Sequence, residues 1–159
     1  MSSAMIPVNP FPSAPSKRSY VSGEAAADRM RVAYFRAPDS DHLHAAVWFG
    51  PGTEGPPDSV HGGAIAAVLD EAMGGVCWMN GHPVVGARIT INYLHLTPLG
   101  FEGRVESWIE HIDGRKISIK SKLTGNGGRV HAEGDGLFIQ LQPEQQARFD
   151  EARARRRDG

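Results

Sequence analysis

Residues 61–79, with the sequence HGGAIAAVLDEAMGGVCWM, form the longest apolar stretch of the chain. Within it, apolar side chains recur at the spacing of one helix face, at Ile65, Val68, Leu69, Ala72, Met73 and Val76. Most of the remaining positions are Ala or Gly, so this helix is small and apolar nearly all round. Such a helix belongs in a protein interior, and we predict a buried helix over residues 62–79 that packs against a sheet.

The segments around this helix have the patterns of strands. Two apolar stretches precede it, at 32–35 and 43–49, and four segments follow it, at 87–96, 104–112, 116–123 and 129–141. The pair Asp113-Gly114 indicates a type I′ hairpin turn. The order β-β-α-β-β-β-β predicts an α+β fold in which an antiparallel sheet wraps around one long central helix.

We expect three parts along the chain. We predict a flexible N-terminal arm over residues 1–24, because this segment begins with a stretch rich in Ser and Pro. Residues 25–142 contain the helix and the strands and form the globular domain. Residues 143–159 begin at Pro143, are rich in charge, and predict a C-terminal helix or tail.

The composition limits which kinds of binding partner and which cellular compartment we expect. The net charge of -1, from 17 basic and 18 acidic residues, gives no reason to expect a nucleic acid or an acidic membrane surface. One cysteine, Cys77, cannot form an internal disulfide, so we expect a cytoplasmic protein. No apolar run approaches the roughly 20 residues that cross a bilayer, and prolines interrupt the N-terminal residues where a signal peptide would need an apolar core.

The start of the predicted helix has features of a binding site for partial negative charge. Gly62 and Gly63 follow His61, so a ligand can approach the first backbone N–H groups closely. These groups lack helical partners and, with the helix dipole, favour an oxygen that becomes an oxyanion. A structural interpretation stays open, in which the glycines make a turn and His61 only caps the helix.

Asp70 and Glu71 are the only ionisable residues between Gly62 and Met79. A carboxylate in an apolar helix is costly unless it is paired or faces a cleft. The two side chains point in different directions, and the simplest interpretation of Glu71 is a carboxylate that faces solvent. For Asp70, a structural salt bridge is the alternative to a functional carboxylate.

Gly62 and Asp70 are eight residues apart, or roughly 12 Å along one helix. A reacting carbonyl needs its oxyanion donor and its nucleophile both within about 3 Å. One helix cannot supply both, whereas two antiparallel helices related by a two-fold axis can. The sequence therefore predicts that, if these residues are catalytic, two identical sites form at a homodimer interface.

At these residues the chain resembles a known family. The segment His61 to Ala66, followed by Asp70 and Gly74, is similar to the signature of hot-dog-fold acyl-CoA thioesterases of the phenylacetate-pathway (PaaI) type. Within these it resembles most the mammalian thioesterase-superfamily group. The similarity runs over roughly residues 45–141, through Ile91-Asn92-Tyr93, Thr97 to Gly100, Gly114-Arg115-Lys116, Ala132-Glu133-Gly134 and Gly136-Leu137-Phe138.

The resemblance implies a role for each site residue. The Gly62 N–H polarises the thioester carbonyl, Gly63 assists, and His61 shapes the helix entrance. Asp70 of the other subunit acts as nucleophile or as general base for water. The acyl chain lies between the subunits, and neither a metal nor a cofactor is needed beyond the coenzyme A of the acyl-CoA substrate.

One position departs from the family pattern. Members often carry Ser or Thr on the strand after the helix, and that position is Gly86 here. Either Asp70 works without this hydroxyl, or another group near the substrate, such as Asn80 or His82, replaces it, or the activity is weak.

Other candidates and alternatives stay open. Arg115 and Lys116, on a hairpin, are candidates for contact with the phosphates of coenzyme A. A non-catalytic acyl-CoA-binding protein and a hot-dog hydratase or dehydratase are the alternative functions. The sequence does not decide between a dimer and a dimer of dimers.

Overall fold

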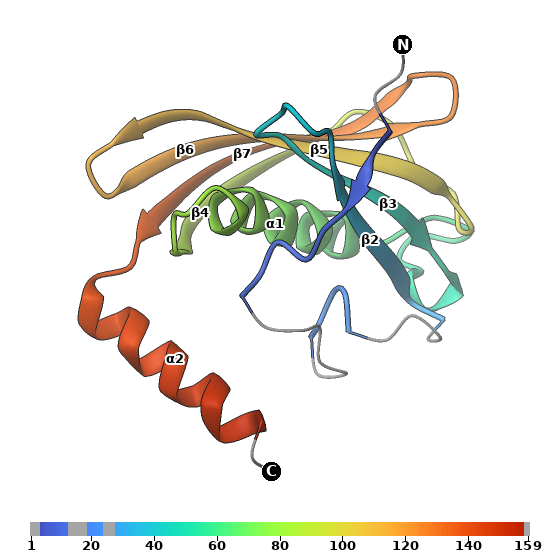
Figure 1. Cartoon of the computed structure of the whole chain (residues 1–159). Coiled ribbons are helices and arrows are strands. Elements are labelled where there is room, and N and C mark those ends of the chain that lie inside the picture. Colours follow the sequence, from blue (N-terminus) through green and yellow to red (C-terminus); the bar gives the residue numbers. More distant parts are fainter. Residues whose placement is uncertain (1–3, 13–18, 24–27, 158–159) are drawn as a thin grey trace.

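The computed structural model describes residues 4–12, 19–23 and 28–157. In chain order its elements are β1 (Ile6–Pro7), β2 (Met30–Arg36), β3 (Leu43–Phe49), a 3-10 turn (Pro51–Thr53), α1 (Gly62–Met79), β4 (Val84–Tyr93), β5 (Glu102–Asp113), β6 (Lys116–Gly125), β7 (Val130–Gln140) and α2 (Pro143–Arg157). The strands form a seven-stranded antiparallel sheet in the order β1-β2-β3-β5-β6-β7-β4. This sheet curves around α1, which confirms the predicted α+β class (Figure 1).

The predicted helix has the expected bounds and the expected buried face. All six residues of the helical pattern are buried, and Leu69 and Met73 are fully buried. On the sheet, the side-chain-free positions Gly134 and Gly136 of β7 leave room for them, since a Cβ at Gly136 would lie 2.9 Å from the Met73 sulfur. Glycine in a strand here permits the close approach of helix and sheet.

Strand β4 differs from its prediction in both bounds and exposure. It begins and ends three residues earlier than expected, because a bulge between Gly86 and Arg88 breaks the alternation and the chain leaves the ladder after Tyr93. The N–H groups of Leu94 and His95 both point to the same carbonyl, that of His131. β4 is the last strand of the sheet, pairs with β7 alone among the described strands, and is exposed along most of its length.

The turn type of the hairpin between β5 and β6 also differs from its prediction. Asp113 pairs with Lys116, so the two central residues of the turn are Gly114 and Arg115. Gly114 has φ +56, whereas Arg115 is not among the described residues with positive φ. A type I′ turn needs positive φ at both central positions, so the turn is of the II′ kind, with glycine first.

The described part of the predicted N-terminal arm packs on the domain. Ile6 and Pro7 pair with β2, Val8 donates a backbone hydrogen bond to Tyr34, and Val21 is buried. The expectation of a flexible arm is therefore wrong for these residues, because they cover apolar surface beside α1. Residues 1–3, 13–18 and 24–27 of the arm and its junction lie outside the described residues.

Glu71 does not face solvent as the simplest interpretation had it. It is half-buried on α1, and its carboxylate accepts a 2.7 Å hydrogen bond from the Tyr34 hydroxyl. Burial raises the pKa of Glu71 more than its hydrogen bonds with Tyr34 and Ser22 lower it. Burial and the neighbouring Glu71 charge raise the pKa of Tyr34 well above its usual value.

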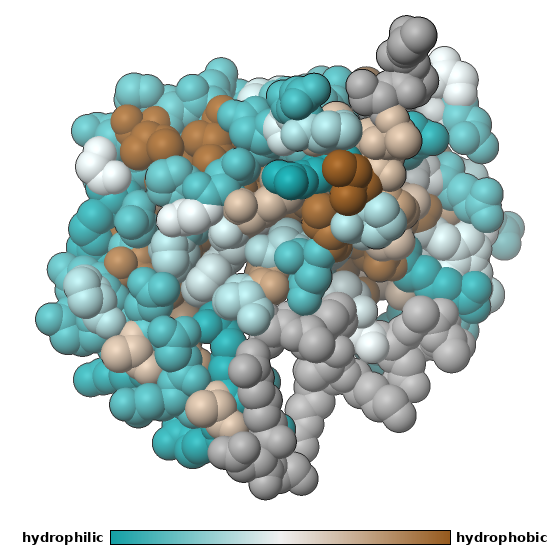
Figure 2. Space-filling view, viewed as in Figure 1, coloured by the Kyte–Doolittle hydropathy of each residue, from teal (hydrophilic) through white to brown (hydrophobic). Residues whose placement is uncertain are grey.

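The charged C-terminal segment is a helix, as predicted, and α2 extends away from the sheet (Figure 1). The Arg153 guanidinium lies 5.1 Å from the ring centre of Trp78 and links α2 to the end of α1. The surface on this side is largely hydrophilic, with an apolar patch beside β1 (Figure 2). Within the described residues, no helix has the length and apolar character to cross a membrane.

We expect Glu71→Gln to stabilise the fold at high pH. The glutamine oxygen can still accept from Tyr34, while the cost of burying a charge disappears. At pH 8 the variant should unfold at a temperature higher by roughly 1–3 °C. The gain should vanish as the pH falls below the ordinary carboxyl value of about 4.3, where both states are protonated. Thermal unfolding of both proteins at pH 8 and pH 4 measures this, and an equal difference at both pH values would contradict the buried charge.

Candidate active site

The entrance of α1 is fixed by a histidine cap. His61 has φ -60 and ψ 133, the extended backbone of an N-cap residue, and its Nδ1 accepts a 2.8 Å hydrogen bond from the Gly63 N–H. Since the backbone N–H is the donor, Nδ1 is the unprotonated ring nitrogen. The His61 N–H in turn donates to the Thr53 carbonyl at 2.7 Å.

The cap changes the expected roles of the two glycines. The Gly63 N–H is already donated to His61 and so is not free to assist at a substrate carbonyl. The Gly62 N–H has no acceptor among the described residues. Among the described residues, the helix entrance therefore leaves the Gly62 N–H open to an acceptor and uses the Gly63 N–H to hold the cap.

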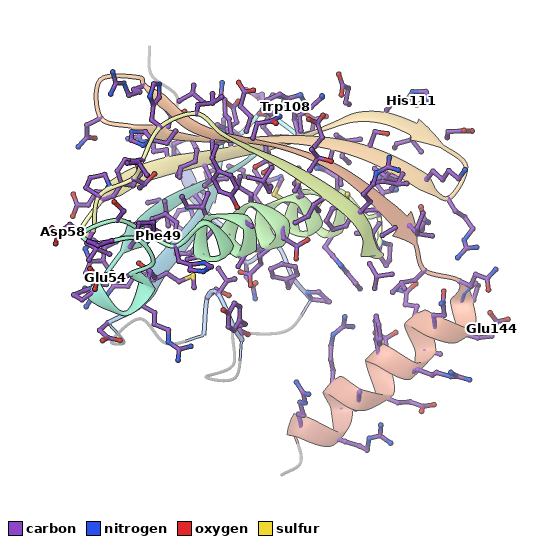
Figure 3. All side chains as sticks on the ribbon, turned by 180° about the vertical axis from the view of Figure 1, so that it is seen from behind. Phe49, Glu54, Asp58, Trp108, His111 and Glu144 are labelled. Atoms are coloured by element: carbon purple, nitrogen blue, oxygen red, sulfur yellow. The ribbon has the colours of Figure 1, made fainter. Side chains whose placement is uncertain are left out.

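Tyr93 also contacts this entrance, although the sequence did not single it out. Its hydroxyl donates a 2.7 Å hydrogen bond to the Gly62 carbonyl. Tyr93 is the last residue of β4, 31 positions from Gly62, so no local sequence pattern predicts this contact. In Figure 3, Glu54 and Asp58 mark the end of the molecule where α1 begins.

Asp70 lies beside β4, the exposed edge strand. A Cβ built at Gly86 would lie 3.6 Å from the Asp70 Oδ1, which places this carboxylate next to the position that lacks the family hydroxyl. Asp70 is exposed in the single chain, yet desolvation by the surrounding apolar atoms raises its pKa. No ion pair to Asp70 is present within the described residues, so the salt-bridge interpretation has no support.

Within one chain, the donor and the carboxylate remain apart. Gly62 is the first residue of α1 and Asp70 the ninth, so the two are roughly 12 Å apart along the axis. The structure thus supplies each half of the expected site but does not join them in one chain.

Two residues considered as replacements for the missing hydroxyl are not near Asp70. Asn80 is the C-cap of α1, roughly 15 Å beyond Asp70 along the axis. Its side-chain amide donates to the carbonyls of Asp41 and Val76, both at 2.8 Å, which is a structural role. His82 follows the same helix end, where its N–H bonds the Cys77 carbonyl.

The hairpin with Arg115 and Lys116 also lies at the far end of α1. The Arg115 side chain donates to the Gln140 carbonyl at 3.1 Å, and Gln140 pairs with Val84, which follows the helix shortly after its end. These two cations are therefore remote from Gly62 of the same chain.

Other side chains that can be reactive have structural roles in this fold. Cys77 is fully buried, and burial raises its pKa to about 12, so it is a packed thiol. Glu106 accepts from His42 at 2.8 Å, and the His42 ring stacks on Trp108 on the outer face of the sheet. Among the described residues, no group of three or more His, Cys, Asp or Glu side chains is arranged to hold a metal ion.

Comparison with known proteins shows what this chain is similar to. Residues 58–132, which include the α1 entrance, Asp70 and the whole of β4, match the Thioesterase superfamily. An acyl-coenzyme A thioesterase, THEM4 of Xenopus laevis, is 36% identical over 96 residues, which are 59% of this chain and 43% of that protein. The chain thus spans less than half the length of this relative.

Solved structures of the thioesterase superfamily share the fold. The Escherichia coli PaaI protein of the phenylacetic acid degradation operon superposes with a TM-score of 0.64 at 16% identity, over 74% of this chain and 83% of that one. A hypothetical thioesterase of Streptococcus pneumoniae, solved with coenzyme A, gives 0.63 at 17% identity, over 74% and 89%. At these identities the likeness concerns the fold, and it confirms the hot-dog architecture.

The space beside Gly86 leads to a prediction about Asp70. A Cβ there makes only ordinary contacts, the nearest at 3.5 Å from the Phe138 ring, so a serine should fit. Its hydroxyl can donate to the Asp70 carboxylate and favour the charged form. We expect Gly86→Ser to lower the pKa of Asp70 relative to Gly86→Ala, which adds the carbon without the hydroxyl. Carboxyl ¹³C NMR titration measures both variants, and identical titration curves would show that position 86 does not reach Asp70.

Proposed function

We propose that the protein hydrolyses acyl-CoA thioesters to a free acid and coenzyme A, as a homodimer with two identical sites. The observation that carries this proposal is the division of the site between two groups: the Gly62 N–H, which has no acceptor among the described residues, and Asp70, which lies beside the edge of the sheet that no described strand covers. The names of the relatives and the coenzyme A bound to a structural neighbour support the substrate class.

The unpaired edge of β4 supports the dimer. Pairing of β4 with β4 of a second copy would extend the sheet and satisfy its edge groups. Apolar side chains exposed at and just beyond this strand would be covered, namely Val85, Tyr93, Leu94 and Leu96. The antiparallel partner helix would then bring its own entrance beside Asp70.

In the proposed reaction the thioester carbonyl accepts a hydrogen bond from Gly62 of one subunit, with His61 holding the entrance. Asp70 of the other subunit then follows one of two routes. As a general base it removes a proton from water, which adds to the carbonyl and expels the coenzyme A thiolate. As a nucleophile it adds to the carbonyl itself and expels the coenzyme A thiolate, which leaves an anhydride; water then hydrolyses the anhydride to the free acid and restores the Asp70 carboxylate. In both routes the negative oxygen of the tetrahedral intermediate lies at the Gly62 N–H.

The proposal also covers the recognition of coenzyme A and the cellular compartment. Arg115 and Lys116 of a neighbouring subunit would contact the phosphates of coenzyme A, since the hairpin lies far from Gly62 of its own chain. No further cofactor takes part in the proposed steps. The cytoplasmic setting expected from the sequence remains a prediction.

A non-catalytic acyl-CoA binder is the second candidate. The observation that favours it is Gly86, which leaves Asp70 without the hydroxyl that family members often place there. In such a protein the Gly62 N–H would hold the carbonyl, and Asp70 would have no chemical role.

Thiol release from a panel of acyl-CoA chain lengths separates the two candidates. We expect turnover by the wild type and a loss of about 10²-fold or more in Asp70→Asn, because the amide can neither attack nor remove a proton. Glu71→Gln is the matched control, since it neutralises the adjacent carboxylate of the same helix, and it should retain activity. Binding of acyl-CoA without turnover by the wild type would favour the second candidate instead.

Gly62→Pro tests the oxyanion donor. Proline is tolerated at the first helical position, where it removes the N–H and adds ring carbons, and the extended backbone of His61 suits a following proline. We expect a loss of about 10²-fold or more in kcat. Gly62→Ala adds a Cβ and keeps the N–H, so it should lose much less, and similar losses in both variants would contradict the role of this amide.

A further inference from the structure

We propose that Tyr93 is a positioning residue for the reaction, because its hydroxyl holds the peptide that follows Gly62 and so keeps the Gly62 N–H in its working orientation. This inference rests on the proposed thioesterase function. It concerns a residue that lies on the sheet and not on the catalytic helix.

The contact between Tyr93 and the helix entrance is close and specific. The hydroxyl donates to the Gly62 carbonyl at 2.7 Å, although the side chain is 52% exposed. A Cβ at Gly62 would lie 3.1 Å from both the Cζ and the hydroxyl oxygen of Tyr93. The phenol therefore occupies the space that a side chain at position 62 would need.

The helix entrance needs this restraint because two successive glycines begin it. Glycine has the widest backbone freedom, so an unrestrained first turn would fray and its N–H groups would change direction. The peptide between Gly62 and Gly63 is held at both ends, at its oxygen by Tyr93 and at its N–H by the His61 Nδ1.

The peptide before Gly62 is held as well. The His61 carbonyl accepts from the Ala64 N–H at 2.9 Å, while the His61 N–H donates to Thr53. The N–H groups of Gly63, Ala64 and Ile65 all donate to His61, so among the first four N–H groups of α1 that of Gly62 alone has no acceptor within the described residues. A preorganised donor of this kind stabilises a developing oxyanion without reorganisation.

Tyr93 also links the donor to the proposed dimer. It ends β4, the edge strand beside Asp70 that we propose to pair with a second copy. Pairing would restrain the strand, and the strand restrains the phenol. The strand that would recruit the partner and the side chain that would orient the oxyanion donor thus belong to one element.

Tyr93→Phe tests this role, with Tyr34→Phe as the matched control. Each tyrosine donates a 2.7 Å hydrogen bond to α1, Tyr93 to Gly62 at the entrance and Tyr34 to Glu71 on another face. We expect Tyr93→Phe to lower kcat about 3- to 10-fold, the effect of one hydrogen bond, with KM changed less than about twofold. Tyr34→Phe should lower the unfolding temperature and leave kcat unchanged.

Two further measurements do not depend on activity alone. Hydrogen exchange by NMR should be faster at the Gly63 and Ala64 amides, which are hydrogen-bonded to His61, in Tyr93→Phe and unchanged there in Tyr34→Phe. A double-mutant cycle combines Gly62→Ala with Tyr93→Phe. Because the added Cβ at position 62 should act largely by displacing the Tyr93 phenol, the kcat of the double variant should be about as low as that of either single variant.

An unchanged kcat, a raised KM with kcat intact, or unchanged exchange at Gly63 and Ala64 in Tyr93→Phe would each overturn the positioning role. These outcomes differ from failure of the proposed function, in which the wild type itself releases no thiol from any acyl-CoA.

Discussion

The structure depends on one constraint: a buried helix must begin with its backbone donors satisfied, and α1 satisfies all but one. His61 takes the Gly63 N–H, and Tyr93 and Thr53 bind the neighbouring polar groups, while the Gly62 N–H has no acceptor in the described part of the chain. A lone donor at the positive end of a helix dipole attracts a partial negative charge. These contacts hold the helix entrance, and with it the Gly62 N–H, in place.

The sheet determines where Asp70, the second group of the proposed site, lies. Gly134 and Gly136 of β7 let Leu69 and Met73 approach closely, and this packing brings the next residue of the helix, Asp70, beside β4. There the carboxylate is exposed but poorly solvated, which raises its pKa. A carboxylate in such surroundings is a better base than one in water. The geometry within one chain leaves this carboxylate without an oxyanion donor, and the antiparallel second chain of the proposed dimer would supply one.

Much of this arrangement could be predicted from the sequence. The helical spacing from Ile65 to Val76 predicted the buried helix, and its bounds agree with those of α1. The bounds of β4 were missed because the bulge at Gly86 interrupts the alternation on which strand prediction relies. Glu71 was misjudged because the Tyr34 hydroxyl that binds it comes from a strand 37 residues away. The contact of Tyr93 with Gly62 was missed for the same reason, since contacts between distant segments leave no local pattern.

The division of each site between two chains can be measured by mixing inactive subunits. Asp70→Asn and Gly62→Pro each remove one half of both sites in their own homodimer. In a mixed dimer, one site carries both defects and the other carries neither. The two variants are mixed in equal amounts, unfolded and refolded together. We predict that this restores about a quarter of wild-type activity, because half of the dimers are mixed and each mixed dimer has one intact site of two. A mixture as inactive as its parents, despite formation of mixed dimers, would contradict the shared site.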